Sequence, residues 1–224
     1  MTRGLQWSEW MVTEKRAVEL LAPFGVRLCS EQIGQLLAYL ELLLKWNSKM
    51  NLTAVRSGEE CVTRHFGESL FLATKRELSG WLLDIGSGAG FPGLALKIAF
   101  PKLAAVLLEP VGKKRAFLKE VVRTCGMESV EIRPERLVEF VGQCVEGGGH
   151  RVLDAATSRA VGKFEDLIPQ AGRCLKPHGN LYLWLSHEQG KAVVGTCPGT
   201  FEWVEAMPIP GVEGHEIWCG SRRV

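Results

Sequence analysis

The residues with the clearest chemical potential form the glycine-rich stretch "LLDIGSGAGFPGLAL" at residues 82–96. Glycines allow tight turns and let a ligand lie against the backbone without colliding with Cβ atoms. Phe91 and Pro92 follow the turn, where they add bulk and remove an N–H donor that a pyrophosphate would use. The spacing is G-x-G-x-G, not the G-x-G-x-x-G of dinucleotide-binding folds, with glycines at Gly86, Gly88, Gly90 and Gly93. The loop therefore favours a ligand without phosphates, and S-adenosylmethionine, which joins an adenosine, a sulfonium and an amino acid, is such a ligand.

Two acidic residues flank this loop in the chain. Glu109, in "VLLEP", follows Gly86 by 23 residues, the distance at which an acidic side chain can accept hydrogen bonds from both ribose hydroxyls of an adenosine. Asp84 stands at the tip of the preceding strand, where its carboxylate could take the ammonium group of the cofactor. Taken alone, each has a purely structural alternative, a surface acid for Glu109 and a cap on the glycine turn for Asp84. With the loop between them, the binding interpretation is favoured.

A basic cluster directly follows Glu109. Lys113, Lys114 and Arg115 begin the next helix at the rim of the expected cleft, where they could hold RNA phosphates. Cations at a helix start oppose the helix dipole, which favours a binding role over a stabilising one. The net charge of +2 neither demands nor excludes a polyanionic partner, and a solvated helix face is the alternative.

The elements that must position these residues follow from the hydrophobic pattern. After Gly80, short apolar runs alternate with helical stretches, which predicts an α/β fold with a central, mostly parallel seven-stranded sheet and helices on both faces. We expect strands at 81–85, 103–109, 129–133, 152–158 and 181–186, and two antiparallel closing strands within 200–210 and 215–221. We expect helices at 92–100, 113–126 and 163–175, and a turn at 176–180.

The N-terminal part of the chain is predicted to be helical. Apolar residues recur three and four apart from residue 12 to 45, where Ser30 can cap the second of two helices. "KWNSKMNLTAV" (45–55) is typical of a loop, and a further helix is expected over 61–77. The sequence thus predicts a helical appendage at residues 1–79 and a ligand-binding α/β domain at residues 80–224.

Other features narrow the class of protein. No run of about 18 apolar residues is present, and the first residues lack the apolar core of a signal peptide, so a cytoplasmic protein without membrane contact is expected. The seven cysteines are scattered without a C-x-x-C pair, which argues against a zinc site or a disulfide framework. "EGGGH" (146–150) is predicted to be a flexible loop, and we expect a monomer.

Longer motifs carry a resemblance to a known family. "KWNSKMNLTAV", "RHFGESL", "LLDIGSGAGFPGLALKIAFP", "LLEPVGKKRAFL" and "SRAV" occur in the order and spacing of the bacterial small-subunit ribosomal RNA methyltransferase G family, also called glucose-inhibited division protein B. The resemblance covers residues 46–161 well and the remainder loosely. It implies a Rossmann-like class I methyltransferase fold, with S-adenosylmethionine as cofactor, and methylation of guanine N7 in the 530 loop of 16S rRNA within the 30S subunit or its precursor.

The resemblance also implies site residues. The cofactor contacts of the family fall on Gly86, Phe91, the Leu137–Val138 pair and Arg159. Asn51, Arg64 and His65 in the helical appendage are further candidate RNA contacts, and for His65 only the resemblance favours this role over a structural one. Two basic residues usual in the family are replaced, a lysine near Leu185 and an arginine at Gly214, and both are expected near the RNA.

The chemistry of guanine N7 explains which motifs are missing. N7 carries an in-plane lone pair and no proton, so the enzyme needs neither a general base nor a covalent intermediate and must mainly align the reactants. No N/D-P-P-Y motif and no Pro-Cys pair occur in the sequence. Arg159 could orient the base or the cofactor, or bridge strand and helix structurally. The target base should be in a loop or flipped, because the major groove of an RNA helix is too narrow for side chains.

Two rival functions remain at this point. One is a methyltransferase of the same fold that acts on another RNA, a small molecule or a protein. The other is a non-catalytic RNA-binding factor for ribosome assembly that keeps the fold.

Overall fold

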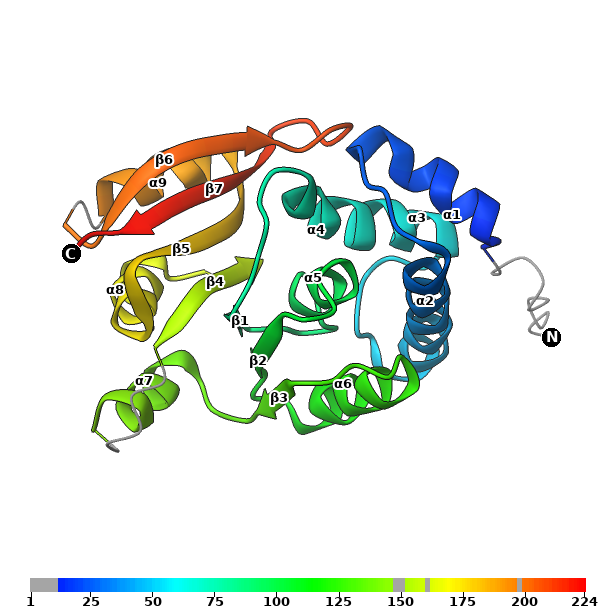
Figure 1. Cartoon of the computed structure of the whole chain (residues 1–224), viewed down its shortest axis with the longest axis horizontal. Coiled ribbons are helices and arrows are strands. Elements are labelled where there is room, and N and C mark those ends of the chain that lie inside the picture. Colours follow the sequence, from blue (N-terminus) through cyan, green and yellow to red (C-terminus); the bar gives the residue numbers. More distant parts are fainter. Residues whose placement is uncertain (1–11, 147–151, 160–161, 197–198) are drawn as a thin grey trace.

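The computed structural model describes residues 12–146, 152–159, 162–196 and 199–224 and has a seven-stranded sheet at its centre (Figure 1). The strand order is β3-β2-β1-β4-β5-β7-β6. Strands β1 to β5 are parallel, whereas β7 runs antiparallel to both β5 and β6. The strands are β1 (Trp81–Ile85), β2 (Ala104–Leu108), β3 (Val130–Arg133), β4 (Leu153–Arg159), β5 (Leu175–Ser186), β6 (Phe201–Pro208) and β7 (His215–Arg222). This arrangement confirms the predicted α/β fold and its antiparallel closing strands.

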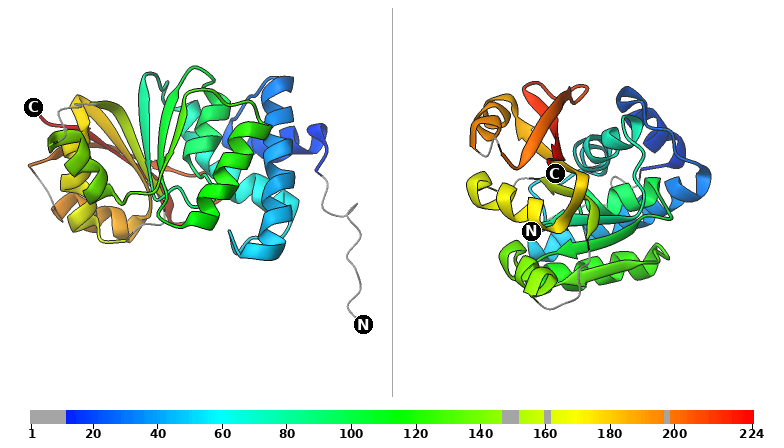
Figure 2. Two further views of the ribbon diagram at one scale, coloured as in Figure 1. Left: turned by 90° about the horizontal axis from the view of Figure 1, so that it is seen from below. Right: turned by 60° about the vertical axis from the view of Figure 1, so that its left-hand side comes forward.

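Alternation along the strands separates two hydrophobic cores, because successive side chains of a strand point to opposite faces. Leu82 of β1 packs with helices α5 (Gly93–Ala99) and α6 (Gly112–Thr124) on one face. Leu83 and Ile85 pack with α7, α8 and α9 on the other face. These three helices span Leu137–Glu146, Phe164–Cys174 and His187–Thr196. Figure 2 shows helices on both sides of the sheet.

The N-terminal helices lie on the α5–α6 side of the sheet (Figure 1). They are α1 (Glu14–Leu21), a 3-10 turn (Ala22–Phe24), α2 (Ser30–Met50), and a continuous helical stretch of α3 (Gly58–Cys61), a π-helical turn (Val62–Gly67), α4 (Glu68–Leu70) and a 3-10 turn (Phe71–Thr74). Helix α2 contacts both α5 and α6, and its buried side chains belong to the same hydrophobic core as those of β1 and β2. The helical segment therefore packs directly against the half of the sheet that carries the glycine loop.

Helix α2 is longer than the sequence predicts. It continues to Met50, so the loop expected over residues 45–55 begins only at Asn51, which ends the helix in a left-handed conformation (φ 48°). Asn47 does not break the helix because its buried side chain is used by the next segment. Its Nδ2 donates to the carbonyl of Val55 at 3.0 Å, and its Oδ1 accepts from the N–H of Thr53 at 2.9 Å. The cap of α2 is Cys29 rather than Ser30.

Two further local predictions differ from the structure. The helix predicted over 61–77 starts at Gly58 and contains the π-helical turn. The turn predicted at 176–180 is a bulge within β5, since Leu175 pairs with Leu153 while Asn180 pairs with Ala155. Helices α7 and α9 are not among the predicted elements. Of the loop predicted at 146–150, only Glu146 belongs to the described residues, as the last residue of α7.

Within the described residues, no helix is both long and apolar enough to cross a membrane. The same residues contain no group of three His, Cys, Asp or Glu side chains that could hold a metal ion. Cys29, Cys61, Cys125, Cys174 and Cys219 are free thiols, and Cys197 lies outside the described residues.

Candidate cofactor site

The glycine loop connects the carboxyl end of β1 to helix α5. Gly86, Gly88 and Gly90 adopt positive φ angles of 72°, 56° and 91°, a region that side chains with a Cβ rarely enter. The N–H of Ser87 donates to the carbonyl of Leu108 at 3.0 Å and ties the loop to β2. A Cβ at position 88 would meet nothing closer than a carbonyl oxygen at 3.8 Å. The loop therefore has an open surface at Gly88, which the side chain of any other residue would cover.

Glu109 reaches this loop from the end of β2 and is buried. Its Oε2 accepts a hydrogen bond from the N–H of Gly88 at 2.9 Å, and its Oε1 accepts one from the N–H of Val111 at 2.8 Å. The carboxylate thus fixes both the loop and the start of α6. An ionised carboxylate offers about four acceptor positions, and these two N–H groups occupy two of them.

Asp84 lies beneath the loop and is completely buried. Its Oδ2 accepts from the N–H of Gly93 at 3.2 Å, and its Oδ1 accepts from the hydroxyl of Thr157 at 3.0 Å. Burial raises the pKa of Asp84 to about 6, against the opposing effect of hydrogen bonds from Ser87, Thr157 and Gly93. The carboxylate therefore joins β1, β4 and α5. These bonds correspond to the structural alternative for Asp84, a cap on the glycine turn.

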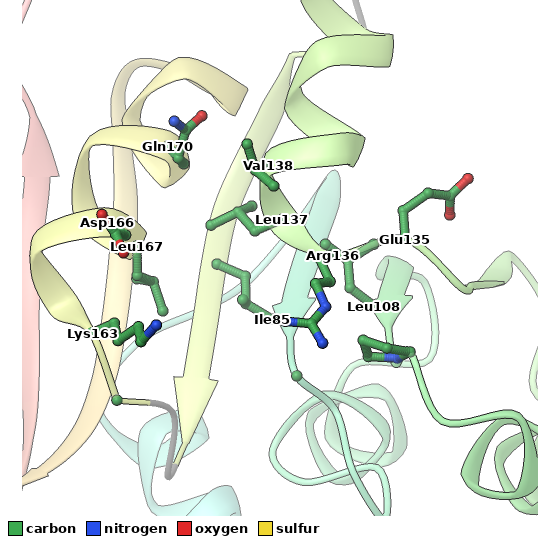
Figure 3. Close-up of a pocket in the computed structure, with 13 residues that line it drawn as sticks. Ile85, Leu108, Glu135, Arg136, Leu137, Val138, Lys163, Asp166, Leu167 and Gln170 are labelled. Carbon is green, nitrogen blue, oxygen red and sulfur yellow. The ribbon is translucent and has the colours of Figure 1, made fainter.

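A pocket of about 290 Å³ lies over the ends of β1 and β2, between α7 and α8 (Figure 3). This position matches the crevice at the carboxyl ends of the strands, where the strand order reverses between β1 and β4. Leu137 and Leu167 enter the pocket from opposite helices. The apolar part of the lining consists of Ile85, Leu108, Pro110, Leu137, Val138 and Leu167, with Gly86 at the loop. Such a lining suits a flat, largely apolar group such as adenine.

Several charged or polar residues that line the pocket are not among the site residues predicted from the sequence. Glu135, Arg136, Lys163, Asp166 and Gln170 also line the pocket. The carboxylate of Glu135 accepts from Arg133 at 2.7 Å and from Gln143 at 3.3 Å, and the hydrogen bond from Arg133 is the main cause that lowers its pKa to about 2. Glu135 and Arg136 follow β3, Lys163 and Asp166 lie at the start of α8, and Gln170 lies within α8. Their position at strand and helix ends is the signal that could have identified them.

A second polar cluster surrounds Arg159 at the end of β4. Its Nη2 donates to Glu68 Oε2 and to the carbonyl of Arg64, both at 2.7 Å. Its Nη1 is buried and has no hydrogen-bond partner within the described part of the chain. Burial raises the pKa of Glu68, while the charges of Arg159 and Arg64 act in the opposite direction. Arg159 therefore has one nitrogen held by two acceptors and one buried nitrogen without a partner among the described residues.

His65 lies beside this cluster. Its Nε2 shares a hydrogen bond of 2.6 Å with the hydroxyl of Thr53, and its ring stacks on Phe91 with 4.9 Å between the centroids. Burial, assisted by the charges of Arg159 and Arg64, lowers the pKa of His65 to about 3. The imidazole is therefore neutral at physiological pH. The structure thus brings Arg64, His65 and Arg159 together.

The other candidate RNA contacts lie at the start of α6 and at the end of α2. Lys113 is exposed and Lys114 is partly exposed at the start of α6, whereas Arg115 donates to the carbonyls of Glu109 at 2.9 Å and Pro110 at 2.6 Å. Asn51 accepts a hydrogen bond from Arg56 at 3.1 Å.

Arg64 forms an exposed ion pair with Glu60 at 3.1 Å. Of the positions where the family's basic residues are replaced, Leu185 is buried in β5 and Gly214 lies in the turn before β7.

Comparisons with known proteins identify similar sequences. The family model described as rRNA small subunit methyltransferase G (GidB) matches residues 32–193. A protein named ribosomal RNA small subunit methyltransferase G from Chloroflexus aggregans is 37% identical over 175 residues, covering 75% of this chain and 72% of its own length. A protein of the same name from Roseiflexus castenholzii is 37% identical and covers 88% of this chain and 86% of its own length. The one from Pseudomonas aeruginosa is 34% identical, with 95% and 98% covered.

Solved structures share the fold at low sequence identity. A predicted O-methyltransferase from Agrobacterium tumefaciens aligns with a TM-score of 0.59 and 19% identity, covering 69% of this chain and 80% of its own. A ribosomal protein L11 methylase from Lactobacillus delbrueckii aligns with a TM-score of 0.58 and 13% identity, covering 72% and 80%. These likenesses show that the fold is that of the class I methyltransferases.

Proposed function

The chain belongs to the rRNA small subunit methyltransferase G family, and on this basis we propose that it transfers a methyl group from S-adenosylmethionine to N7 of a guanine in the 530 loop of 16S rRNA. The proposed substrate is the rRNA within the 30S subunit or its precursor, on which the enzyme acts as a monomer in the cytoplasm.

The observation that carries the cofactor assignment is the apolar pocket that opens beside Gly86. Leu137 and Val138, to which the family resemblance assigns cofactor contacts, line this pocket, and the glycine loop leaves an open surface next to Glu109. When bound, S-adenosylmethionine supplies an activated methyl group. In the proposed arrangement, Leu108, Leu137 and Val138 hold the adenine, and Glu109 accepts hydrogen bonds from the ribose hydroxyls.

The cluster around Arg159 fits a reaction without proton transfer. A guanine that is methylated at N7 becomes a cation, so additional positive charge nearby would oppose the reaction. Glu68 offsets the charge of Arg159, and His65 is neutral because its pKa is about 3. In the proposed role, Nη1 of Arg159, which has no partner among the described residues, donates to the cofactor or to the target base, and no residue acts as a general base.

Two glycine substitutions test the cofactor site with a matched control. Gly88 and Gly126 both have positive φ angles, 56° and 59°, and a Cβ has space at either position. Replacement of either by alanine should therefore cost a similar free energy of unfolding, about 1–2 kcal/mol. Only Gly88→Ala covers the open surface of the loop. We expect it to lose S-adenosylmethionine binding in calorimetry, while Gly126→Ala binds like the parent. Equal affinities for the two variants would mean that the open surface of the loop is not part of the cofactor site.

The substrate assignment needs a transfer assay. Labelled S-adenosylmethionine is supplied with 30S subunits, free 16S rRNA, tRNA or protein from a cell extract, with Gly88→Ala as the inactive control. We expect label in 16S rRNA that depends on the parent protein. Label only in tRNA or only in protein would overturn the substrate, and failure of the folded parent to bind S-adenosylmethionine would favour a non-catalytic assembly factor.

A further inference from the structure

A buried tyrosine of the N-terminal helical segment contacts the glycine loop from behind. Tyr39 lies in the middle of α2, and its hydroxyl donates a hydrogen bond to the carbonyl of Ala89. Ala89 stands between Gly88 and Gly90, so the bond holds the central peptide of the loop. The two residues are 50 positions apart in the chain, and Tyr39 is completely buried. The segment before residue 80 therefore contributes directly to the geometry of the loop.

The ring of Tyr39 also supports the residue at which the loop ends. It stacks on Phe91 in a nearly parallel arrangement, with 5.2 Å between the centroids and an interplanar angle of 5°. The ring of His65 also stacks on Phe91, and Phe66 packs edge-on against both Tyr39 and Phe91 at 5.1 and 5.0 Å. Three rings of the helical segment thus enclose Phe91 and keep it away from solvent.

The packing between Tyr39 and the loop leaves no spare space. A side chain at Gly90 would collide with the hydroxyl of Tyr39 and with the side chain of Leu94. Burial raises the pKa of Tyr39 well above its ordinary value of 10, so the hydroxyl keeps its proton and remains a donor in the working pH range of a protein. Without this donor, the carbonyl of Ala89 would need another hydrogen-bond partner. A change in the direction of the carbonyl would change the conformation of the loop.

We propose that Tyr39 is a positioning residue for the cofactor, which holds the glycine loop in its binding conformation through the hydrogen bond to Ala89 and the stack on Phe91. The proposal rests on the proposed function only in naming the cofactor. The physical effect is a population shift. If the loop of the free protein leaves the binding conformation part of the time, the apparent dissociation constant rises by the inverse of the remaining fraction.

The chain offers a matched control, because its only other tyrosine is Tyr182. Tyr182 is also buried, but it lies on β5, opposite Cys219 of β7. Tyr39→Phe and Tyr182→Phe each remove one buried hydroxyl and keep the ring. Both should lower thermal stability to a similar extent, whereas only Tyr39→Phe should affect the loop.

Two measurements separate positioning from general stability. The first is hydrogen exchange without ligand in the peptide that covers residues 86–91, where the N–H groups of Gly88, Gly90 and Phe91 are hydrogen-bonded. The second is the dissociation constant for S-adenosylmethionine. For the loss of one hydrogen bond, we expect Tyr39→Phe to speed exchange in this peptide by roughly 3- to 10-fold and to weaken cofactor binding by a similar factor. Tyr182→Phe should match the parent in both.

The outcomes distinguish this proposal from the proposed function. Exchange and affinity that change equally little in the two variants would overturn the positioning role, even where both lose stability. Faster loop exchange in Tyr39→Phe with unchanged cofactor affinity would likewise contradict it. If the parent itself binds no S-adenosylmethionine, the proposed function fails, and the exchange measurement still decides whether Tyr39 holds the loop.

Discussion

Replacement of Glu109 by glutamine tests the physical basis of the glycine loop. The two oxygens of this carboxylate accept separate hydrogen bonds from the N–H groups of Gly88 and Val111, at 2.9 and 2.8 Å. Glutamine keeps the shape of the side chain but offers only one acceptor oxygen, so its NH2 group must face one of the two donors. One hydrogen bond is lost, and two donors are left facing each other.

The expected loss of stability follows from these contacts. A hydrogen bond to a charged group contributes about 1.5–3 kcal/mol. Val111 is exposed, so water can satisfy a freed N–H there, and we expect a loss near the lower end, about 2 kcal/mol in the free energy of unfolding. For a chain of this length, each kcal/mol corresponds to about 2–4 °C in Tm. Glu109→Gln should therefore unfold about 4–8 °C below the parent when followed by circular dichroism.

Glu120→Gln is the matched control for this substitution. Glu120 accepts one hydrogen bond, from Nε1 of Trp46 at 3.0 Å, and glutamine can accept the same bond. Its Tm should stay within about 2 °C of the parent. If Glu109→Gln unfolds together with Glu120→Gln, the two loop hydrogen bonds do not stabilise the protein and the reasoning is refuted.

The same variant separates the two roles of Glu109. If the carboxylate also accepts from the ribose, Glu109→Gln should lose more affinity for S-adenosylmethionine than for its 2′-deoxy analogue, measured by calorimetry. Equal losses for the two ligands would mean that Glu109 organises the loop and does not touch the ribose.

Two further substitutions test electrostatic parts of the account. Asp84→Asn removes a carboxyl group, and burial raises the pKa of this group from 3.8 to about 6. An acid whose pKa is higher in the folded than in the unfolded protein contributes less to stability as the pH rises. Between pH 4.5 and 7.5, the parent should thus lose about 2 kcal/mol relative to the variant in urea unfolding, whereas parallel pH profiles would contradict the shift. Lys114→Ala should weaken RNA binding and reduce its salt slope by about one, while Lys15→Ala on α1 leaves the slope unchanged. Equal slopes for both variants would exclude a phosphate contact at Lys114.

The sheet could be predicted from the sequence because its signal is local. Each parallel strand is a short apolar run, and the ends of β1 and β2 place Gly86 and Glu109 next to each other once the strands are paired. The spacing of Glu109 from the loop therefore predicted their proximity, which the hydrogen bond to Gly88 shows. What the spacing could not predict is that both carboxylate oxygens are already used by backbone N–H groups.

The errors arise where tertiary contacts override local preference. Asn47 is a weak helix former, but its side-chain bonds to the following loop allow α2 to continue. Gly190 weakens the helical signal of α9 in the sequence, because glycine is a poor helix former. The structure needs glycine there, since a Cβ would collide with the ring of Trp218. The contact between Tyr39 and Ala89 joins residues on different elements, and no local pattern reports it.

The measurement that tests the central claim most directly is the position of the methyl group in the RNA. 30S subunits that lack N7-methylguanine in the 530 loop are incubated with the protein and S-adenosylmethionine, and 16S rRNA is then cleaved chemically at N7-methylguanine and mapped by primer extension. The account predicts one new site, in the 530 loop, that is absent with Gly88→Ala. A methyl group elsewhere in the RNA, or none at N7 of guanine while the cofactor binds, would contradict it.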